Sequence, residues 1–247
     1  MFSFFKSQPK NARRDFAHIG VDMHSHLIPG IDDGAKNLDD SLALIGRLQD
    51  LGFQKIITTP HVYQQYYPNT SETILSGLET VRAAVAERGM NIEINAAAEY
   101  FMDETFAELI EKRDLLTLNS KYVLVEVSFF GLPPTLDLML FRMQVNGFQP
   151  IMAHPERYTY FKSDLSGYQD LKDAGCLLQV NTLSLAGYYG PEVQKMATKL
   201  IKAGLIDLIG TDLHHERHAA ALAGAFKKSD FVKTLSEYPF KNAEVLG

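Results

Sequence analysis

Seven short apolar runs alternate with helical patterns along nearly the whole 247-residue chain, and this alternation constrains the fold more than any other feature. The runs lie at residues 18–23, 54–59, 92–98, 121–127, 149–153, 177–181 and 206–211. Most of them are continuously apolar, as in YVLVEV and LIDLIG. Strands buried on both faces have such sequences, which are typical of parallel sheets. The chain is therefore predicted to be an α/β protein, with either a closed or distorted barrel or an open doubly wound sheet.

Three of the helices between these runs have clear boundaries in the sequence. The first is predicted over 38–51, where Asn37 can cap its start and Gly52 stops it. The second is predicted over 71–88 and the third over 191–203. Apolar residues recur in them at the spacing of one helical face, which predicts that each helix packs against the strands.

A polar side chain stands at or just beyond the carboxyl end of every predicted strand. In chain order these are His24 and His26, His61, Glu99, Glu126, His154, Asn181, and Asp212 with His214. In a (β/α) barrel these ends converge on one face, where active sites form. In an open sheet only the strands near the switch point could share a site. The registration therefore favours a barrel over an open sheet.

Nine side chains are candidate metal ligands. They are His24, His26, Asp33, His61, Glu99, Glu126, His154, Asp212 and His214. One catalytic zinc ion uses about three protein ligands, and an octahedral ion at most about six, so nine donors predict two or three ions. Imidazole and carboxylate ligands without a thiolate favour manganese, iron or zinc. Clustered divalent ions activate water and stabilise both the attacking and the leaving oxygen, which favours hydrolysis of a phosphate ester.

Two arginines are candidates for contacts with a phosphate group. Arg157 lies three residues beyond His154, in AHPERY, and Arg217 lies in the last predicted loop. A guanidinium can donate two parallel hydrogen bonds to phosphate oxygens. The alternative for each arginine is an ordinary surface ion pair.

Other reactive side chains are predicted to have structural roles. His18 should face the opposite end of the barrel, His215 and His218 should lie on a surface, and Cys176 should lie in the core. The chain has no Gly-rich Walker loop, no Gly-x-Ser-x-Gly elbow and no cysteine-phosphatase loop. The tyrosine-rich loop after His61, together with residues 100–101, could form an aromatic wall for a substrate ring or could simply pack.

Composition bounds the class of protein. The net charge of -6 and the pI near 5.7 argue against a nucleic-acid surface, which is usually basic. One cysteine, no secretory leader pattern and no run of about 20 apolar residues predict a cytoplasmic protein without stable membrane insertion. Residues 1–17 are predicted to be a separate, flexible segment, whose Phe2, Phe4 and Phe5 could dock on the body or touch a membrane surface, and 18–247 to be a single domain.

Six segments resemble the PHP (polymerase and histidinol phosphatase) superfamily. They are DMHSH, TTPH, AAAEY, LVEVSF, MAHPERY and GTDLHH, in this order. Within it, IPGIDDG, HPERY and the overall size resemble the bacterial manganese-dependent tyrosine phosphatases of capsule and exopolysaccharide synthesis. The resemblance runs from about residue 19 to the last predicted strand. It implies a distorted (β/α)7 barrel of the TIM type, Mn2+ as the cofactor, and one-step attack on phosphorus by a metal-activated hydroxide.

The resemblance also implies roles for individual residues. The ligand sets would be His24, His26, Glu99 and Asp212 for one ion, Glu99, Glu126 and His154 for a second, and Asp33, His61 and His214 for a third. Asp33 is preferred to Asp32 because the family's ligand immediately precedes the glycine. Arg157 matches the family's phosphate-contacting arginine, and Arg217 falls near another. His214, if free of metal, could protonate the leaving group.

Four functions remain open from the sequence. The first is a protein-tyrosine phosphatase acting on a bacterial tyrosine kinase or its tail in capsule regulation. The second is a small-molecule phosphatase such as histidinol phosphatase. The third, a nuclease or nucleotide phosphoesterase, is weakened by the acidic charge. The fourth is a metal-stabilised binding module without catalysis, and the sequence leaves the oligomeric state open.

Overall fold

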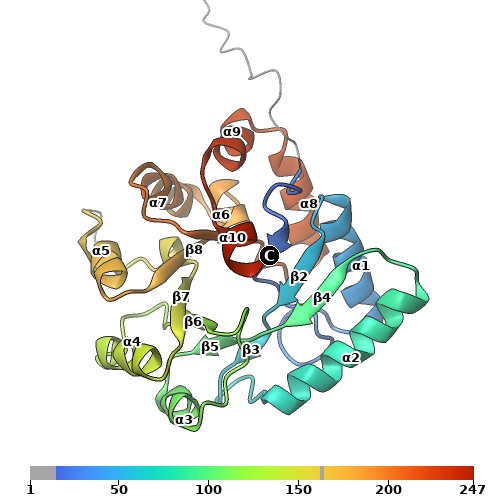
Figure 1. Ribbon diagram of the computed structural model, residues 1–247. Coiled ribbons are helices and arrows are strands. Elements are labelled where there is room, and N and C mark those ends of the chain that lie inside the picture. Colours follow the sequence, from blue (N-terminus) through green and yellow to red (C-terminus); the bar gives the residue numbers. More distant parts are fainter. Residues whose placement is uncertain (1–14, 162–163) are drawn as a thin grey trace, which may run out of the picture.

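The computed structural model describes residues 15–161 and 164–247, which form parallel strands surrounded by helices (Figure 1). The strands are β1 (Val21–Asp22), β2 (Lys55–Thr58), β3 (His61–Val62), β4 (Glu93–Ala96), β5 (Glu99–Phe101), β6 (Tyr122–Glu126), β7 (Gln149–Ala153), β8 (Leu177–Asn181) and β9 (Leu208–Gly210). The α-helices are α1 (Leu38–Asp50), α2 (Ser71–Glu87), α3 (Glu104–Lys112), α4 (Leu136–Val145), α5 (Ser166–Asp173), α6 (Thr182–Leu185), α7 (Pro191–Lys202), α8 (Glu216–Ala225), α9 (Ser229–Glu237) and α10 (Asn242–Leu246). The predicted α/β alternation is confirmed.

Seven strand positions follow one another around the barrel wall. β1, β2 and β4 pair in that order, and β3, β5, β6, β7, β8 and β9 form a second parallel sheet. β3 and β5 were not predicted. After a short break in pairing, β3 continues the strand position of β2, and β5 continues that of β4. Backbone hydrogen bonds cross these breaks, from the N–H of Ala97 to the C=O of Thr58 and from that of Glu99 to Pro60. The two sheets therefore make one distorted wall.

Hydrogen bonds also join the first strand region to the last. The N–H of Asp212 donates to the C=O of His24 at 2.7 Å, and that of His26 donates to Leu213 at 2.9 Å. In strand β1, the buried Asp22 carboxylate accepts hydrogen bonds from the backbone N–H and the hydroxyl of Thr211. An open sheet would leave these edges unpaired, so the expected distorted (β/α)7 barrel is confirmed.

Apolar side chains fill the barrel toward the amino ends of its strands. Met23, Ile57, Leu124 and Ile151 belong to this interior cluster, and each is almost fully buried. Helix α10 lies across that end of the ring (Figure 1). The amide of Asn242, at its start, donates to two backbone carbonyls of the wall, and the backbone of β9 donates to its oxygen. The polar residues are consequently left at the carboxyl ends, where barrel enzymes have their sites.

The helix boundaries agree with the sequence to within about one residue. The predicted helices 38–51, 71–88 and 191–203 correspond to α1, α2 and α7. The side chain of Asn37 accepts a hydrogen bond from the N–H of Asp40, as a cap should. Within the described residues, no helix combines the length and the apolarity that crossing a membrane requires.

The predicted amino-terminal segment lies mostly outside the described residues. Phe2, Phe4 and Phe5 are among the residues that are not described, so their docking stays a prediction. Phe16 is fully buried and stacks on Phe53 with ring centroids 4.7 Å apart. The packed part of the chain thus begins before residue 18.

Candidate active site

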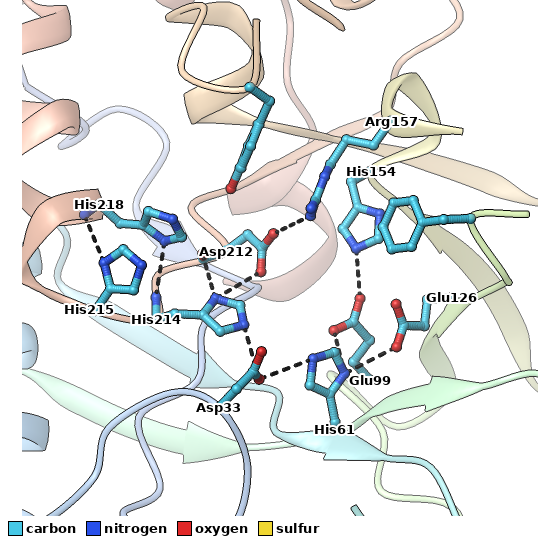
Figure 2. A pocket seen from close by; sticks show the side chains of 12 residues that line it. Asp33, His61, Glu99, Glu126, His154, Arg157, Asp212, His214, His215 and His218 are labelled. Carbon is cyan, nitrogen blue, oxygen red and sulfur yellow. Dashed lines mark hydrogen bonds and ion pairs between the residues drawn. The ribbon is translucent and has the colours of Figure 1, made fainter. Parts of the chain in front are cut away.

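A cavity of about 290 Å³ opens at the carboxyl ends of the strands (Figure 2). Its lining residues are Asp33, His61, Glu99, Glu126, Phe129, His154, Arg157, Tyr189, Asp212, His214, His215 and His218. Seven of the nine candidate ligands are among them, and the other two, His24 and His26, are fully buried within 3.5 Å of Glu99. The structure therefore brings all nine candidates together.

Glycine at two positions leaves room for His24 and His26, which follow strand β1 in the chain. A Cβ atom on Gly34 would lie 2.4 Å from the Cβ of His26, and one on Gly210 would lie 2.6 Å from the Cβ of His24. Such distances are far below van der Waals contact. Glycine at both positions therefore lets the backbone pack directly against the two imidazole-bearing residues.

Two candidate ligands have strained backbones. His154, directly after β7, has φ = 35°, and Asp212, two residues after β9, has φ = 52°. Left-handed conformations of non-glycine residues cost on the order of 1–3 kcal/mol and concentrate at functional sites. Both side chains line the cavity at the strand ends, so the strain falls where a functional site is expected.

Glu99 is the centre of the cluster. Its Oε2 atom lies 3.2 Å from Nε2 of His24, 3.5 Å from Nε2 of His26 and 3.2 Å from Nδ1 of His61. This oxygen is buried, yet it has no hydrogen-bond partner among the described residues. The other oxygen hydrogen-bonds with Nε2 of His154 at 3.0 Å. Ligand atoms this close together could share a cation.

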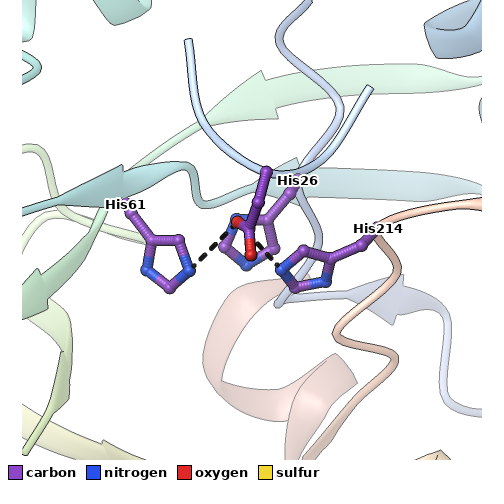
Figure 3. Close-up of side chains that lie close together, drawn as sticks. His26, His61 and His214 are labelled. Carbon is purple, nitrogen blue, oxygen red and sulfur yellow. Dashed lines mark ion pairs between the residues drawn. The ribbon is translucent and has the colours of Figure 1, made fainter. Parts of the chain in front are cut away.

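Four overlapping groups of donor atoms could each hold an ion. They are His24, His26 and Asp212; His24, Glu99 and His154; His61, Glu99 and Glu126; and His26, Asp33, His61 and His214. Figure 3 shows the three imidazoles of the last group gathered around one carboxylate. These groups resemble the expected ligand sets only in part. Glu126 lies with His61 rather than with His154. His24 also lies with Glu99 and His154, and His26 also belongs to the group of Asp33. The assignment of ligands to particular ions stays a prediction.

The electrostatics of the cluster favour bound cations. Burial alone would favour neutral carboxyl groups, but His24 and His61 hold the pKa of Glu99 well below its usual range. Burial likewise opposes a charge on His24, yet Glu99 and Asp212 outweigh it and raise the pKa of His24 to about 9. The carboxylates thus draw protons onto the imidazoles when nothing else neutralises them. Divalent ions would supply this positive charge directly.

Neighbouring polar groups orient several of the candidate ligands. Asp32 hydrogen-bonds with Nδ1 of His26 at 2.8 Å and accepts the backbone N–H of His61 at 3.1 Å. Asp33 instead turns its carboxylate toward Nε2 of His61 and of His214, at 3.5 and 3.4 Å. Asp32 therefore has the geometry of a residue that orients a ligand. The choice of Asp33 as the ligand stays a prediction.

A chain of side-chain hydrogen bonds links His24 to Asp212. Nδ1 of His24 hydrogen-bonds with Gln179 at 2.8 Å, and Gln179 donates to Asn181 at 2.9 Å. Asn181 donates in turn to Oδ2 of Asp212 at 2.7 Å. Asn181 was recognised in the sequence as a polar strand end, and its role here is to hold Asp212 in place.

The Arg157 guanidinium is held between two aromatic rings at the edge of the cavity. Its carbon lies 5.0 Å from the centre of the Phe129 ring and 4.4 Å from that of Tyr189. One of its nitrogens donates to Oδ2 of Asp212 at 3.1 Å. A guanidinium has several donors, so those not used for Asp212 could bind an anion at two points. Arg217 is exposed on α8 and lies outside the cavity lining, so its contact with substrate stays a prediction.

The sequence prediction was wrong for His218. Its side chain is buried, lines the cavity and accepts the backbone N–H of His214 at 3.4 Å. The turn that begins α8 folds His218 back under the loop, where Tyr188 packs edge-on against it. His215 caps α8 by accepting the N–H of His218. Cys176 is buried in the core, as predicted.

Some of the aromatic residues that line the cavity were not predicted from the sequence. Tyr189 and Phe129 were not predicted. Phe129 lies shortly after the end of β6, whereas Tyr189 lies in the loop between α6 and α7. Tyr67, from the tyrosine-rich loop, stacks on the ring of His61 with centroids 5.3 Å apart. Tyr100 is core instead, and its hydroxyl accepts the N–H of Leu116. The predicted aromatic wall is therefore formed by different residues in part.

Comparison with known proteins identifies related chains. A family model described as capsular polysaccharide synthesis, CpsB/CapC, matches residues 20–228. Tyrosine-protein phosphatase YwqE of Bacillus subtilis is 28% identical over 196 residues, covering 79% of this chain and 77% of YwqE. Tyrosine-protein phosphatase CpsB of Streptococcus pneumoniae is 27% identical over 201 residues, covering 79% of this chain and 83% of CpsB.

Solved structures extend the comparison to the fold. A crystal structure from the work on YwqE and CpsB, described as metal-dependent tyrosine phosphatases, superposes with a TM-score of 0.79. The two chains are 25% identical, with 92% of this chain and 94% of the other covered. Histidinol phosphate phosphatase of Lactococcus lactis has a TM-score of 0.52 at 16% identity, covering 85% of this chain and 93% of the other. The second similarity shows a shared fold only.

Proposed function

We propose that this chain, which belongs to the CpsB/CapC family of capsular polysaccharide synthesis, is a metal-dependent protein-tyrosine phosphatase. The observation that carries the proposal is the cavity itself. Converging imidazoles and carboxylates form its floor, and the Arg157 guanidinium stands at its edge between two aromatic rings. The floor suits divalent ions, the arginine suits phosphate, and the rings suit the flat face of a phosphotyrosine.

The donor set supports two or three ions per chain, with Mn2+ as the proposed metal. The residues that would hold them are His24, His26, Asp33, His61, Glu99, Glu126, His154, Asp212 and His214. Bound divalent ions supply Lewis acidity and lower the pKa of a water molecule to near neutrality. Mixed imidazole and carboxylate ligands are compatible with iron or zinc as well.

The chain's own residues bind the phosphate and orient it. Arg157 donates to its non-bridging oxygens and stabilises the charge that develops on them in the transition state. Phe129 and Tyr189 keep the guanidinium plane fixed, so little ordering is needed when substrate arrives. The leaving tyrosine has a pKa of about 10, so phenolate leaves with little assistance. His214, at the cavity wall, can return a proton to it if it is free of metal.

The proposed substrate is a phosphotyrosyl protein, in particular the tail of a bacterial tyrosine kinase that acts in capsule synthesis. The relatives named as tyrosine-protein phosphatases support this substrate class. A kinase tail also places the reaction in the cytoplasm. Histidinol phosphate phosphatase shares the barrel, but at 16% identity the likeness does not extend to its substrate.

A direct comparison of substrates tests the proposal. Metal-stripped protein is reloaded with Mn2+ and given a phosphotyrosyl peptide or histidinol phosphate at matched concentrations. The proposal expects a higher kcat/KM for the peptide. Faster turnover of histidinol phosphate would instead indicate that the same site acts in amino-acid biosynthesis. If neither substrate were hydrolysed, the protein would be a metal-binding protein without phosphatase activity.

Replacing Arg157 by alanine is expected to lower kcat/KM for a phosphotyrosyl peptide by about 10²- to 10³-fold, because one charged donor to the transition state is lost. Bound metal, measured by elemental analysis, should not change. Arg142→Ala, on the exposed surface of α4 and outside the cavity lining, is the matched control and should keep full activity. Loss of metal from Arg157→Ala would show instead that the arginine supports Asp212.

Replacing Tyr189 by phenylalanine is expected to lower kcat by about tenfold. The hydroxyl of Tyr189 is buried at the cavity and has no hydrogen-bond partner among the described residues, so a phosphate oxygen could accept its proton. Burial raises the pKa of Tyr189 above its ordinary value, so the hydroxyl stays a donor at neutral pH. Tyr188→Phe, one residue away and exposed, should have full activity. Equal kcat for both variants would limit Tyr189 to packing against Arg157.

A further inference from the structure

A second and larger cavity runs along the outside of the barrel, between α7 and the start of α9. Its volume is about 880 Å³, and we call it the lysine groove. Lys195, Lys199 and Lys202 line one side, at the spacing of one face of α7. Lys227 and Lys228 line the other side. The proposed catalytic chemistry uses none of them.

The lysine groove concentrates positive charge on a negatively charged chain. Among the residues that the structure describes, five lysines line it against one carboxylate, that of Asp230, whereas the whole chain has a net charge of -6. Lysine ammonium groups clustered within a Debye length of about 8–10 Å reinforce one another's potential in physiological salt. A groove lined by this positive charge favours a polyanionic or acidic ligand.

The lysine groove begins beside the catalytic cavity. Tyr189 lines the catalytic cavity, whereas Leu185 and Pro191, which flank it closely in the chain, line the groove. The segment between them is fastened from the groove side. Lys228 donates to the carbonyl of Ala186, and Gln194 donates to that of Leu185 at 3.0 Å. In Figure 1, α6, which leads into this segment, lies between α7 and α9.

The shape of the groove fits an extended polypeptide. Helix α7 has 12 residues, so at 1.5 Å per residue its face is about 16–18 Å long. An extended chain rises about 3.3 Å per residue, so roughly five residues would occupy that length. Leu185 and Phe231 provide an apolar floor between the lysines.

We propose that the lysine groove binds an acidic segment of the phosphotyrosyl protein while its phosphotyrosine occupies the catalytic cavity. This inference rests on the proposed function and specifies its substrate class. A nucleic acid is disfavoured because a long polyanion would extend beyond the groove and meet the negative field of the rest of the chain. An anionic membrane is disfavoured because the lysines line a recess between two helices rather than a flat face.

Two substrate comparisons test the inference. Phosphotyrosyl peptides carry either four glutamates or four glutamines, placed two, four or six residues to either side of the tyrosine. For the best placement, the acidic peptide should have a KM at least about fivefold lower, and raising the salt concentration should remove the difference. A small aryl phosphate, which cannot reach the groove, measures the catalytic cavity alone.

Charge-reversed variants locate the effect. Lys195 and Lys202 are both exposed, so Lys195→Glu with Lys202→Glu should fold, and Lys195→Gln with Lys202→Gln provides a milder pair. Both pairs should lose the preference for the acidic peptide and keep full activity on the aryl phosphate. Lys112→Glu with Lys121→Glu changes the net charge equally on exposed positions outside the groove, and should keep the preference.

Binding of a fluorescent glutamate-rich peptide without phosphotyrosine separates the groove from catalysis. It should bind the wild-type protein and the Lys112/Lys121 control, and fail to bind the groove variants, even if no phosphoester is hydrolysed. The inference would be overturned if wild type treated acidic and neutral peptides alike, or if the groove variants kept the preference. Groove-dependent capture by phosphatidylglycerol vesicles without any peptide preference would overturn it too, in favour of a membrane surface.

Discussion

Replacing Asp212 by asparagine should lower turnover of a phosphotyrosyl peptide by on the order of 10³-fold or more while the protein stays folded. Oδ1 of Asp212 lies within 3.5 Å of ring nitrogens of His24, His26 and His214. Oδ2 accepts two hydrogen bonds, so the asparagine oxygen should take that position and the amide nitrogen should face the imidazoles. The substitution would thus replace a charge in the metal cluster by a hydrogen-bond donor.

The expected loss does not depend on unfolding. Asparagine tolerates the left-handed backbone found at this position, φ = 52°, and has almost the same volume. Asp207→Asn is a matched control at the opposite end of β9, where Lys172 and Lys241 pair with the carboxylate and help lower its pKa. Asp207→Asn should lower stability near neutral pH but retain turnover. Full activity in Asp212→Asn, or in His154→Ala, would refute the metal assignment.

The residues gathered in the candidate site were largely predictable, because a residue at the carboxyl end of a barrel strand lies at the same face as the residues at the other carboxyl ends. Glu126 is the last residue of β6, His154 follows β7, and Asp212 follows β9. Parallel strands of a closed barrel bring these ends to one face, so residues almost 90 positions apart become neighbours without any knowledge of loops. The continuous apolar runs also distinguished strands from loops, because both faces of each strand are covered.

Side-chain neighbours set by the loops were not predictable in the same way. The break between β2 and β3 falls at 59–60, where the backbone leaves one ladder and enters another. Pro60, which has no backbone N–H, marks the interruption, but it does not indicate that a second ladder follows. His26 approaches both Asp212 and the group around His61 because of the path of the loop beyond it. His218 is buried by a turn, and Tyr189 meets Arg157 through a loop. These contacts depend on tertiary geometry rather than on local spacing.

Stripping divalent ions with a chelator should abolish turnover and lower the melting temperature by about 5–10 °C. One ion at 100 times its dissociation constant stabilises the folded state by about 2.7 kcal/mol, and about 1 kcal/mol shifts the melting temperature by about 2–4 °C at this chain length, so this range is the effect of losing a single ion. In the stripped protein, buried Glu99 and Asp212 depend on imidazole protons for compensation. Calorimetry and rate measurements before and after reloading with Mn2+ provide both values.

Glu99→Gln distinguishes a true cation site from general stabilisation by salt. Because Glu99 contributes to two of the four donor groups, the variant should bind fewer ions, and the chelator should change its melting temperature less. It also removes one buried negative charge, so the stripped variant should melt at or above the stripped wild-type protein. A stripped wild type with undiminished turnover would contradict the metal-dependent mechanism. A chelator effect of equal size in Glu99→Gln would place the stabilising ions elsewhere, because the deepest carboxylate of the cluster could not then be one of their ligands.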